Sequence, residues 1–133
     1  MYFEDFYQGY SFETKKKTIT KKDIISFAEK WDYQPFHIDE KLARQSHYGG
    51  LIASGWQTIA IAHSLILDTQ KISKSSMGSP GLDNVNWFKP VRPNDTIHCT
   101  VTVKSSRKSN SKPFGVTTIC LLYTSPSPRD LST

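Results

Sequence analysis

The chain has 133 residues, the length of one compact domain, which excludes a large two-domain enzyme. Its hydrophobic residues make up 37% of the sequence, and no run approaches the ~20 apolar residues of a membrane helix. The start MYFEDFY also lacks the basic and then apolar layout of a secretory signal. We therefore expect a globular cytoplasmic protein without membrane contact.

The net charge of +5 comes mainly from runs of lysine, which we interpret as solvated surface. Only four residues are arginine, and no aromatic stacking motif lies among the basic runs, so nucleic acid is not an expected partner. A polyanionic small ligand remains compatible with this charge. Cys99 and Cys120 lack metal-ligand spacing, which predicts neither a metal site nor a disulfide framework.

The first half of the chain shows a strand followed by helices. Alternation over residues 10–19 predicts a strand that is solvated on one side. Thr20 and Asp23 then fit a capping box for a helix that ends near Trp31. Residues 32–39 contain Pro35 and predict a constrained loop with an extended residue before the proline.

Two further helices are expected after this loop. Asp39 is placed to cap a short helix through residue 44, which ends near Gly49 and Gly50. Ser54 is placed to cap a long helix over residues 55–68. This helix is apolar on most sides, so we expect it to be buried on nearly all of them.

The second half changes to a period of two. We predict strands over residues 82–88, 96–104 and 114–119, with a turn at 90–95 and a charged loop at 105–113. The order of elements predicts an α+β class, with an antiparallel sheet wrapped around one buried helix.

The last fourteen residues differ in character from the rest. CLLYTSPSPRD, residues 120–130, closely resembles the read-through translation of a transposase adapter used to prepare sequencing libraries. We therefore expect a single domain at residues 1–119 that lacks its native last strand, and a non-native tail at 120–133. The alternative is a strand at 121–124 followed by a Pro-Ser tail.

The most informative pair of side chains is Asp32 and His37. A spacing of five residues would keep them apart on a regular helix or strand, whereas a loop bent by Pro35 can bring them together. A carboxylate and an imidazole at one point can hold and deprotonate a water molecule. The alternative is structural: Asp32 caps a helix end, and His37 is a half-buried histidine with satisfied hydrogen bonds.

A second feature is the start of the long helix at Gly55. Free N–H groups at a helix N-terminus can polarise a carbonyl oxygen, although glycine there also serves close packing. His63, on the same helix, either lines an acyl tunnel or is a packed core histidine. Lys89 and Arg92 flank a turn, where they either meet phosphates or stay solvated.

These motifs in this order resemble one family. WDYQPFHID followed by YGGLIASGWQT is similar to the MaoC-like acyl dehydratases, the family of R-specific enoyl-CoA hydratases with a hotdog fold. The resemblance extends over nearly all of residues 2–104, including NWFKPVRPND. Gln34 is a departure, since many members carry Asn at that position.

The resemblance implies that water is added to a trans-2-enoyl-CoA, or removed from a 3-hydroxyacyl-CoA. It implies that Asp32 and His37 bind the water and that the Gly55 N–H holds the thioester oxygen. We expect no metal and no cofactor, and the resemblance implies a homodimer. The residues expected to contact the acyl-CoA substrate are Pro35, Phe36, Ser54, Trp56 and His63. The alternatives are an acyl-CoA thioesterase of the same fold and a non-catalytic acyl-binding or scaffold subunit.

Overall fold

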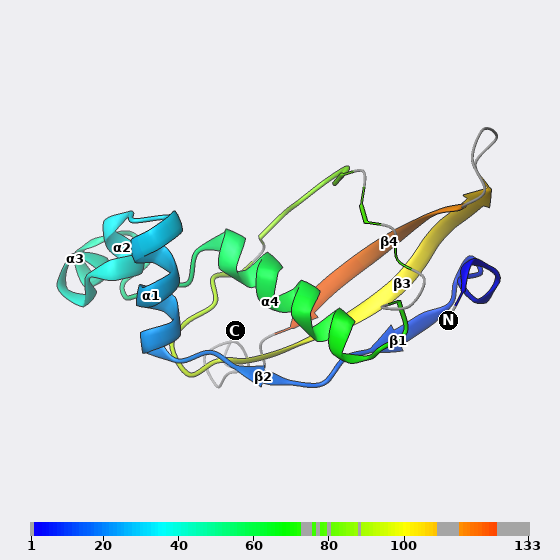
Figure 1. Cartoon of the computed structure of the whole chain (residues 1–133). Helices are drawn as coiled ribbons and strands as arrows, with labels where there is room; N and C mark the ends of the chain where they lie inside the picture. The colour runs from blue at the N-terminus through cyan, green and yellow to red at the C-terminus, as the bar shows by residue number, and fades with distance from the viewer. Residues whose placement is uncertain are drawn as a thin grey trace.

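The computed structural model describes residues 2–72, 76, 78–79, 81–87, 89–108 and 115–124. Its elements in chain order are η1 (Phe3–Asp5), β1 (Ser11–Glu13), β2 (Lys17–Thr18), α1 (Lys21–Trp31), α2 (Pro35–Ile38), α3 (Glu40–Gln45), α4 (Gly55–Asp68), β3 (Thr96–Lys108) and β4 (Gly115–Thr124). Helix α4 runs beside the sheet, and α1 to α3 gather near its N-terminal end (Figure 1). The α+β class predicted from the sequence is confirmed.

The long strand β3 is the centre of the antiparallel sheet. Residues 100–102 of β3 pair with β1 and also with β4, so these two strands lie on opposite edges of β3. Strand β2 pairs with the start of β3, where Lys17 is opposite Ile97. Every described pairing therefore involves β3.

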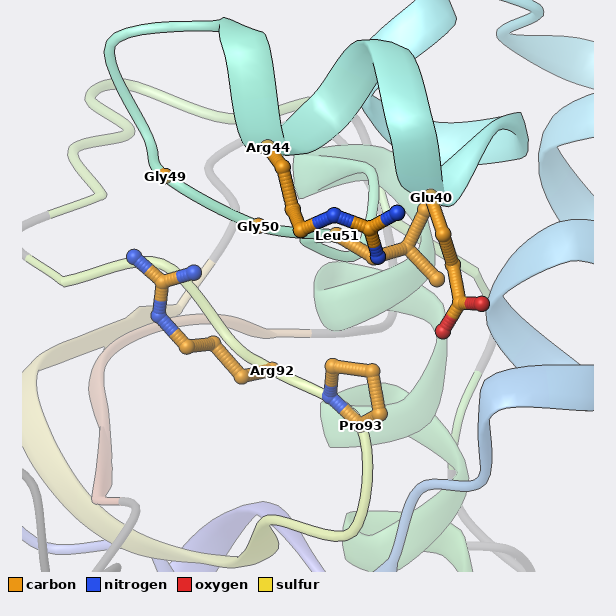
Figure 2. Close-up of a pocket in the computed structure, with 7 residues that line it drawn as sticks. All are labelled: Glu40, Arg44, Gly49, Gly50, Leu51, Arg92 and Pro93. Carbon is orange, nitrogen blue, oxygen red and sulfur yellow. The ribbon is translucent and has the colours of Figure 1, made fainter.

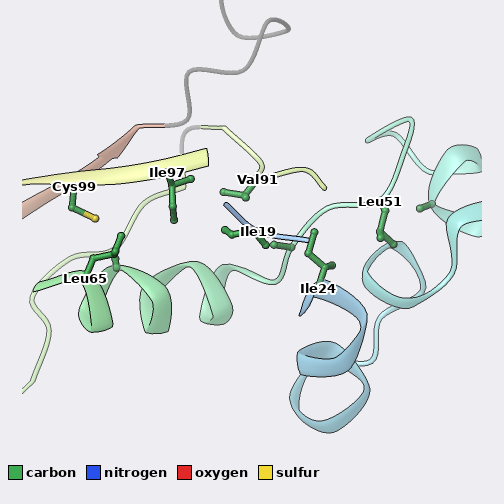
Figure 3. Close-up of a cluster of buried hydrophobic side chains, with 10 residues drawn as sticks. Ile19, Ile24, Leu51, Leu65, Val91, Ile97 and Cys99 are labelled. Atoms are coloured by element: carbon green, nitrogen blue, oxygen red, sulfur yellow. The ribbon is translucent and has the colours of Figure 1, made fainter. Parts of the chain in front are cut away.

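The core lies between α4 and β3. Alternate residues of β3 are buried, namely Ile97, Cys99, Val101 and Val103, as the period of two predicts. Leu65 of α4 belongs to the same cluster as Ile97 and Cys99, and Ile19 and Ile24 extend that cluster toward α1 (Figure 3). The buried cluster thus connects the sheet to the helices that carry the candidate site.

The helix boundaries follow the predicted caps. Thr20 accepts a hydrogen bond from the Asp23 N–H, and Asp23 reciprocates to complete a capping box. Asp39 caps α3 through the Leu42 N–H, and Ser54 caps α4 through the Trp56 N–H. The predicted loop differs from the structure, which has a short helix beginning at Pro35. Pro35 occupies the first turn of α2, where its missing N–H costs no hydrogen bond.

The strand predicted over residues 10–19 is divided into β1 and β2. The Thr14 hydroxyl accepts a 2.9 Å hydrogen bond from the Cys99 N–H, which a strand carbonyl would accept in a regular ladder. The last strand is also longer than predicted, because β4 continues to Thr124. Residues 120–124 therefore pair with β3, as the alternative interpretation of the tail expected. Residues 125–133 lie outside the described residues, and the adapter origin of the tail stays a prediction.

The strand predicted over residues 82–88 is wrong for its described part. Residues 82–87 form no strand, and Leu82, Val85 and Trp87 are exposed. The Trp87 indole instead donates a hydrogen bond to the Gly55 carbonyl oxygen. Alternating apolar residues favour an extended backbone, but they do not determine whether a neighbouring strand is available for pairing.

The expectation that α4 is buried on nearly all sides is also wrong. Its buried residues are Gln57, Thr58, Ala62, Leu65 and Ile66. Trp56, His63 and Leu67 are exposed, because the sheet covers one face of the helix only.

Candidate active site

Asp32 directly follows α1 as its C-cap residue, and its carboxylate is turned toward the start of α4. Its Oδ2 accepts a 2.7 Å hydrogen bond from the Ser54 hydroxyl, and its Oδ1 accepts a 2.7 Å hydrogen bond from the Gln34 side-chain amide. The backbone N–H of Asp32 caps the end of α1, while the side chain of Asp32 is free to make these other hydrogen bonds. The side chain is only 15% exposed, which leaves a carboxylate held in position at the edge of the core.

His37 lies in the short helix α2 and is 4% exposed. Its Nδ1 lies 2.7 Å from the Ile52 carbonyl oxygen, and because a carbonyl only accepts, Nδ1 is assigned the proton. Its Nε2 lies 3.3 Å from Oδ2 of Asp32. The structure thus brings together the two side chains that the sequence singled out, with Nε2 of the imidazole facing the carboxylate.

The surroundings keep Asp32 ionised. Burial raises the pKa of Asp32, but the hydrogen bonds from Gln34 and Ser54, together with the charge of His37, outweigh that effect. The pKa of this carboxyl group therefore lies below its usual value. An ionised carboxylate next to an imidazole can accept a proton from water.

The N-terminus of α4 adjoins this pair through Ser54. The Ser54 side chain is fully buried and caps the helix while it also donates to Asp32. Gly55, the next residue, has an N–H that no hydrogen bond in the described part of the chain uses. The arrangement places a free backbone donor one residue away from the serine that contacts Asp32.

The indole of Trp87 occupies the space beside Gly55. A Cβ atom at Gly55 would collide with this ring, so the indole can occupy this position only because residue 55 is glycine. Trp87 also contacts Trp56 edge to face, with 6.3 Å between ring centroids. Trp56 is 61% exposed and Trp87 is 45% exposed, so the two rings form an apolar surface next to the start of α4.

The remaining predicted residues occupy different surroundings. The Phe36 ring meets the His37 ring edge to face at 4.6 Å between centroids and packs against the core, whereas Pro35 is exposed. His63 is exposed on α4, so the alternative of a packed core histidine is wrong.

Sequence reasoning missed two partners of the site. In the sequence, Gln34 stands out only as a departure from a family pattern. Its position before Pro35 nevertheless predicts an extended backbone, and with that backbone the Gln34 amide reaches back to Asp32. The strand predicted over residues 82–88 includes Trp87, and no local signal indicates the contact of Trp87 with Gly55, 32 residues earlier.

The described residues contain no group of three or more metal-ligating side chains. Within the same part of the chain, every helix is too short or too polar to cross a membrane.

Comparison with known proteins places the chain in a family. Residues 6–121 match the MaoC like domain. The chain belongs to the MaoC-like domain family. It is 31% identical over 121 residues to YdeM, an uncharacterized protein of Bacillus subtilis strain 168, with 91% of this chain and 85% of YdeM covered.

Two other relatives carry a dehydratase name. A 3-hydroxybutyryl-CoA dehydratase of Methylorubrum extorquens is 32% identical over 108 residues, covering 77% of this chain and 64% of that protein. The structure of a MaoC-like dehydratase from Rhodospirillum rubrum is 32% identical with a TM-score of 0.77, covering 95% of this chain and 86% of that one. The chain therefore has the hotdog fold of these MaoC-like dehydratases.

Proposed function

We propose that the protein is a hydratase or dehydratase that interconverts a trans-2-enoyl-CoA and a 3-hydroxyacyl-CoA. The observation that carries this proposal is the 3.3 Å approach of His37 Nε2 to Asp32 Oδ2, an oxygen that also accepts from Ser54 at the start of α4. The name of the Methylorubrum extorquens relative supports the same class of reaction.

In the proposed hydration, a water molecule lies beside this pair and forms hydrogen bonds with both the Asp32 carboxylate and Nε2 of His37. Asp32 takes one proton from it, and the resulting hydroxide oxygen forms a bond to C3 of the enoyl group. The electron pair of the C2–C3 double bond moves into the thioester as an enolate. A proton is then delivered to C2 on the same face, from the acid–base pair.

The Gly55 N–H is the proposed donor to the enolate oxygen. A preorganised backbone donor at such an oxyanion is typically worth ~3 kcal/mol of transition-state stabilisation. Trp87 and Trp56 would border the thioester on the side of this donor, with Phe36 behind His37. Pro35 would set the bend of the loop, and Ser54 would orient Asp32.

An absorbance assay at the enoyl-thioester band, with crotonyl-CoA and longer chains, tests the proposal. Loss of the band without release of free CoA is the expected result. Loss of the band with free CoA released would indicate a thioesterase instead. No change in either signal, on protein shown to be folded, would leave a non-catalytic acyl-binding role.

We also propose that the protein works as a homodimer. One face of α4 is exposed and carries Trp56 and Leu67, and an apolar surface of this kind is commonly covered by a partner. In the proposed dimer the two sheets join edge to edge, and the acyl-CoA site with the Asp32 loop lies between the subunits. Light scattering should give twice the mass of the chain, and a monomer at micromolar concentration would overturn this proposal.

A further inference from the structure

A pocket of about 240 Å³ lies between α3, the loop that precedes α4 and the segment before β3. It is lined by Glu40, Arg44, Gly49, Gly50, Leu51, Arg92 and Pro93 (Figure 2). In Figure 2 the side chain of Arg44 descends from α3, and that of Arg92 rises from the segment before β3. The two arginines thus line one pocket from separate elements, with their guanidinium groups on opposite sides of it in this view.

The charge of this pocket is positive. No hydrogen bond or ion pair in the described part of the chain uses the Arg44 guanidinium, which leaves its donors available. The acidic group in the lining, Glu40, makes a 2.8 Å ion pair with Lys21 and is thereby neutralised. Among the described residues, neither the Arg44 nor the Arg92 guanidinium has a carboxylate partner. Guanidinium groups match phosphate oxygens in geometry and charge.

The pocket is also held in shape by the backbone. Arg92 Nη2 donates a 2.6 Å hydrogen bond to the Tyr48 carbonyl oxygen, and the Arg92 N–H donates to Asp95. Gly49 has a φ of +68°, which favours glycine. A Cβ atom on Gly50 would lie 3.3 Å from Arg92 Nη1, so glycine at this position leaves room for that guanidinium.

The pocket and the candidate active site share one segment of chain. From Gly50 the chain leads through Ile52, whose carbonyl oxygen bonds His37, to Gly55. Five residues span no more than about 18 Å, which is within reach of an extended pantetheine arm. The Phe36 ring contacts both His37 and Tyr48, and Tyr48 directly precedes Gly49 of the pocket lining.

We propose that this pocket binds a phosphate group at the far end of the pantetheine arm that carries the acyl thioester. This inference rests on the proposed function. The phosphate belongs either to coenzyme A or to the phosphopantetheine group of an acyl carrier protein. Arg44 and Arg92 contact it, and the arm extends from there toward the Gly55 N–H.

The test compares crotonyl-CoA with crotonyl-pantetheine, which lacks every phosphate. The variant is Arg44→Gln, because Arg92 also supports Tyr48. The ratio of kcat/KM for crotonyl-CoA to that for crotonyl-pantetheine should fall about tenfold, the scale of one charge-assisted hydrogen bond. Arg107→Gln on the exposed end of β3 removes the same charge elsewhere and is the control. An equal fall in both substrates, or an equal effect of the control, would overturn the inference.

A binding measurement separates the pocket from the reaction. Calorimetry with 4′-phosphopantetheine and with pantetheine should show tighter binding of the phosphorylated compound, and Arg44→Gln should remove the difference. If wild-type protein hydrates neither thioester yet shows this difference, the proposed function fails and the pocket assignment stands. If it hydrates both without preference and binds both compounds equally, the pocket assignment fails. Higher kcat/KM with crotonyl-CoA or with crotonyl-acyl carrier protein identifies the source of the phosphate.

Discussion

The hydroxyl of Ser54 donates a 2.7 Å hydrogen bond to the carboxylate of Asp32, although 22 residues separate them in the chain. The same hydroxyl accepts a hydrogen bond from the Trp56 N–H at the start of α4. One buried side chain therefore joins the end of α1 to the beginning of α4. The proposed base and the proposed oxyanion donor at Gly55 are positioned by this contact.

Replacing Gln34 should move the pH dependence of the reaction. Gln34→Met removes a donor to Asp32, so the pKa of Asp32 should rise toward its usual range. Asp32 must be ionised to take a proton, so activity falls as pH drops through this pKa. The acid limb of kcat/KM should therefore shift to higher pH in the variant. Gln45→Met at the exposed end of α3 is the control, and coincident limbs in both variants would contradict the assignment.

Ser54→Ala should affect both stability and the acid limb. Loss of a helix N-cap costs about 1 kcal/mol of unfolding free energy, measured by urea denaturation. Because Asp32 also loses a donor, its pKa should rise, as in Gln34→Met. Thr20→Ala removes the cap of α1 without touching Asp32, so it should lower stability and leave the acid limb in place. A shifted limb in Thr20→Ala would show that lost stability alone moves it.

Gly55→Ala should destabilise the start of α4, because its new methyl group collides with the indole of Trp87. The loss of unfolding free energy should be of order 1–3 kcal/mol. In a Trp87→Ala background the collision partner is absent, so the same substitution should cost far less. Equal losses in the two backgrounds would show that Trp87 does not fill the space beside Gly55.

The capped helices and the alternating strand were predictable because their signals are local. Thr20 with Asp23 marked the start of α1, and the period of two marked the buried face of β3. By contrast, the exposed face of α4 depends on how much sheet the chain has to cover it. Hydrophobicity along a helix does not carry that information.

The central pair of the candidate site could be predicted from the sequence, but the residues that hold the site in position could not. Pro35 and the short spacing indicated that Asp32 and His37 can meet, and they do. The contacts of Asp32 with Ser54 and of Gly55 with Trp87 join residues more than 20 positions apart. Such contacts follow from tertiary packing, which a single sequence does not display.

The most direct test of the account is turnover of crotonyl-CoA by the Asp32→Asn variant. The substitution preserves the shape of the side chain and removes its basicity, so circular dichroism and the urea midpoint should change little. Turnover should fall by about 10² to 10⁴-fold, the usual contribution of a positioned acid–base group. His37→Ala should fall by a similar factor, with some loss of stability because the Ile52 carbonyl loses its donor. Near-normal turnover by folded Asp32→Asn protein would contradict the assignment of the water site.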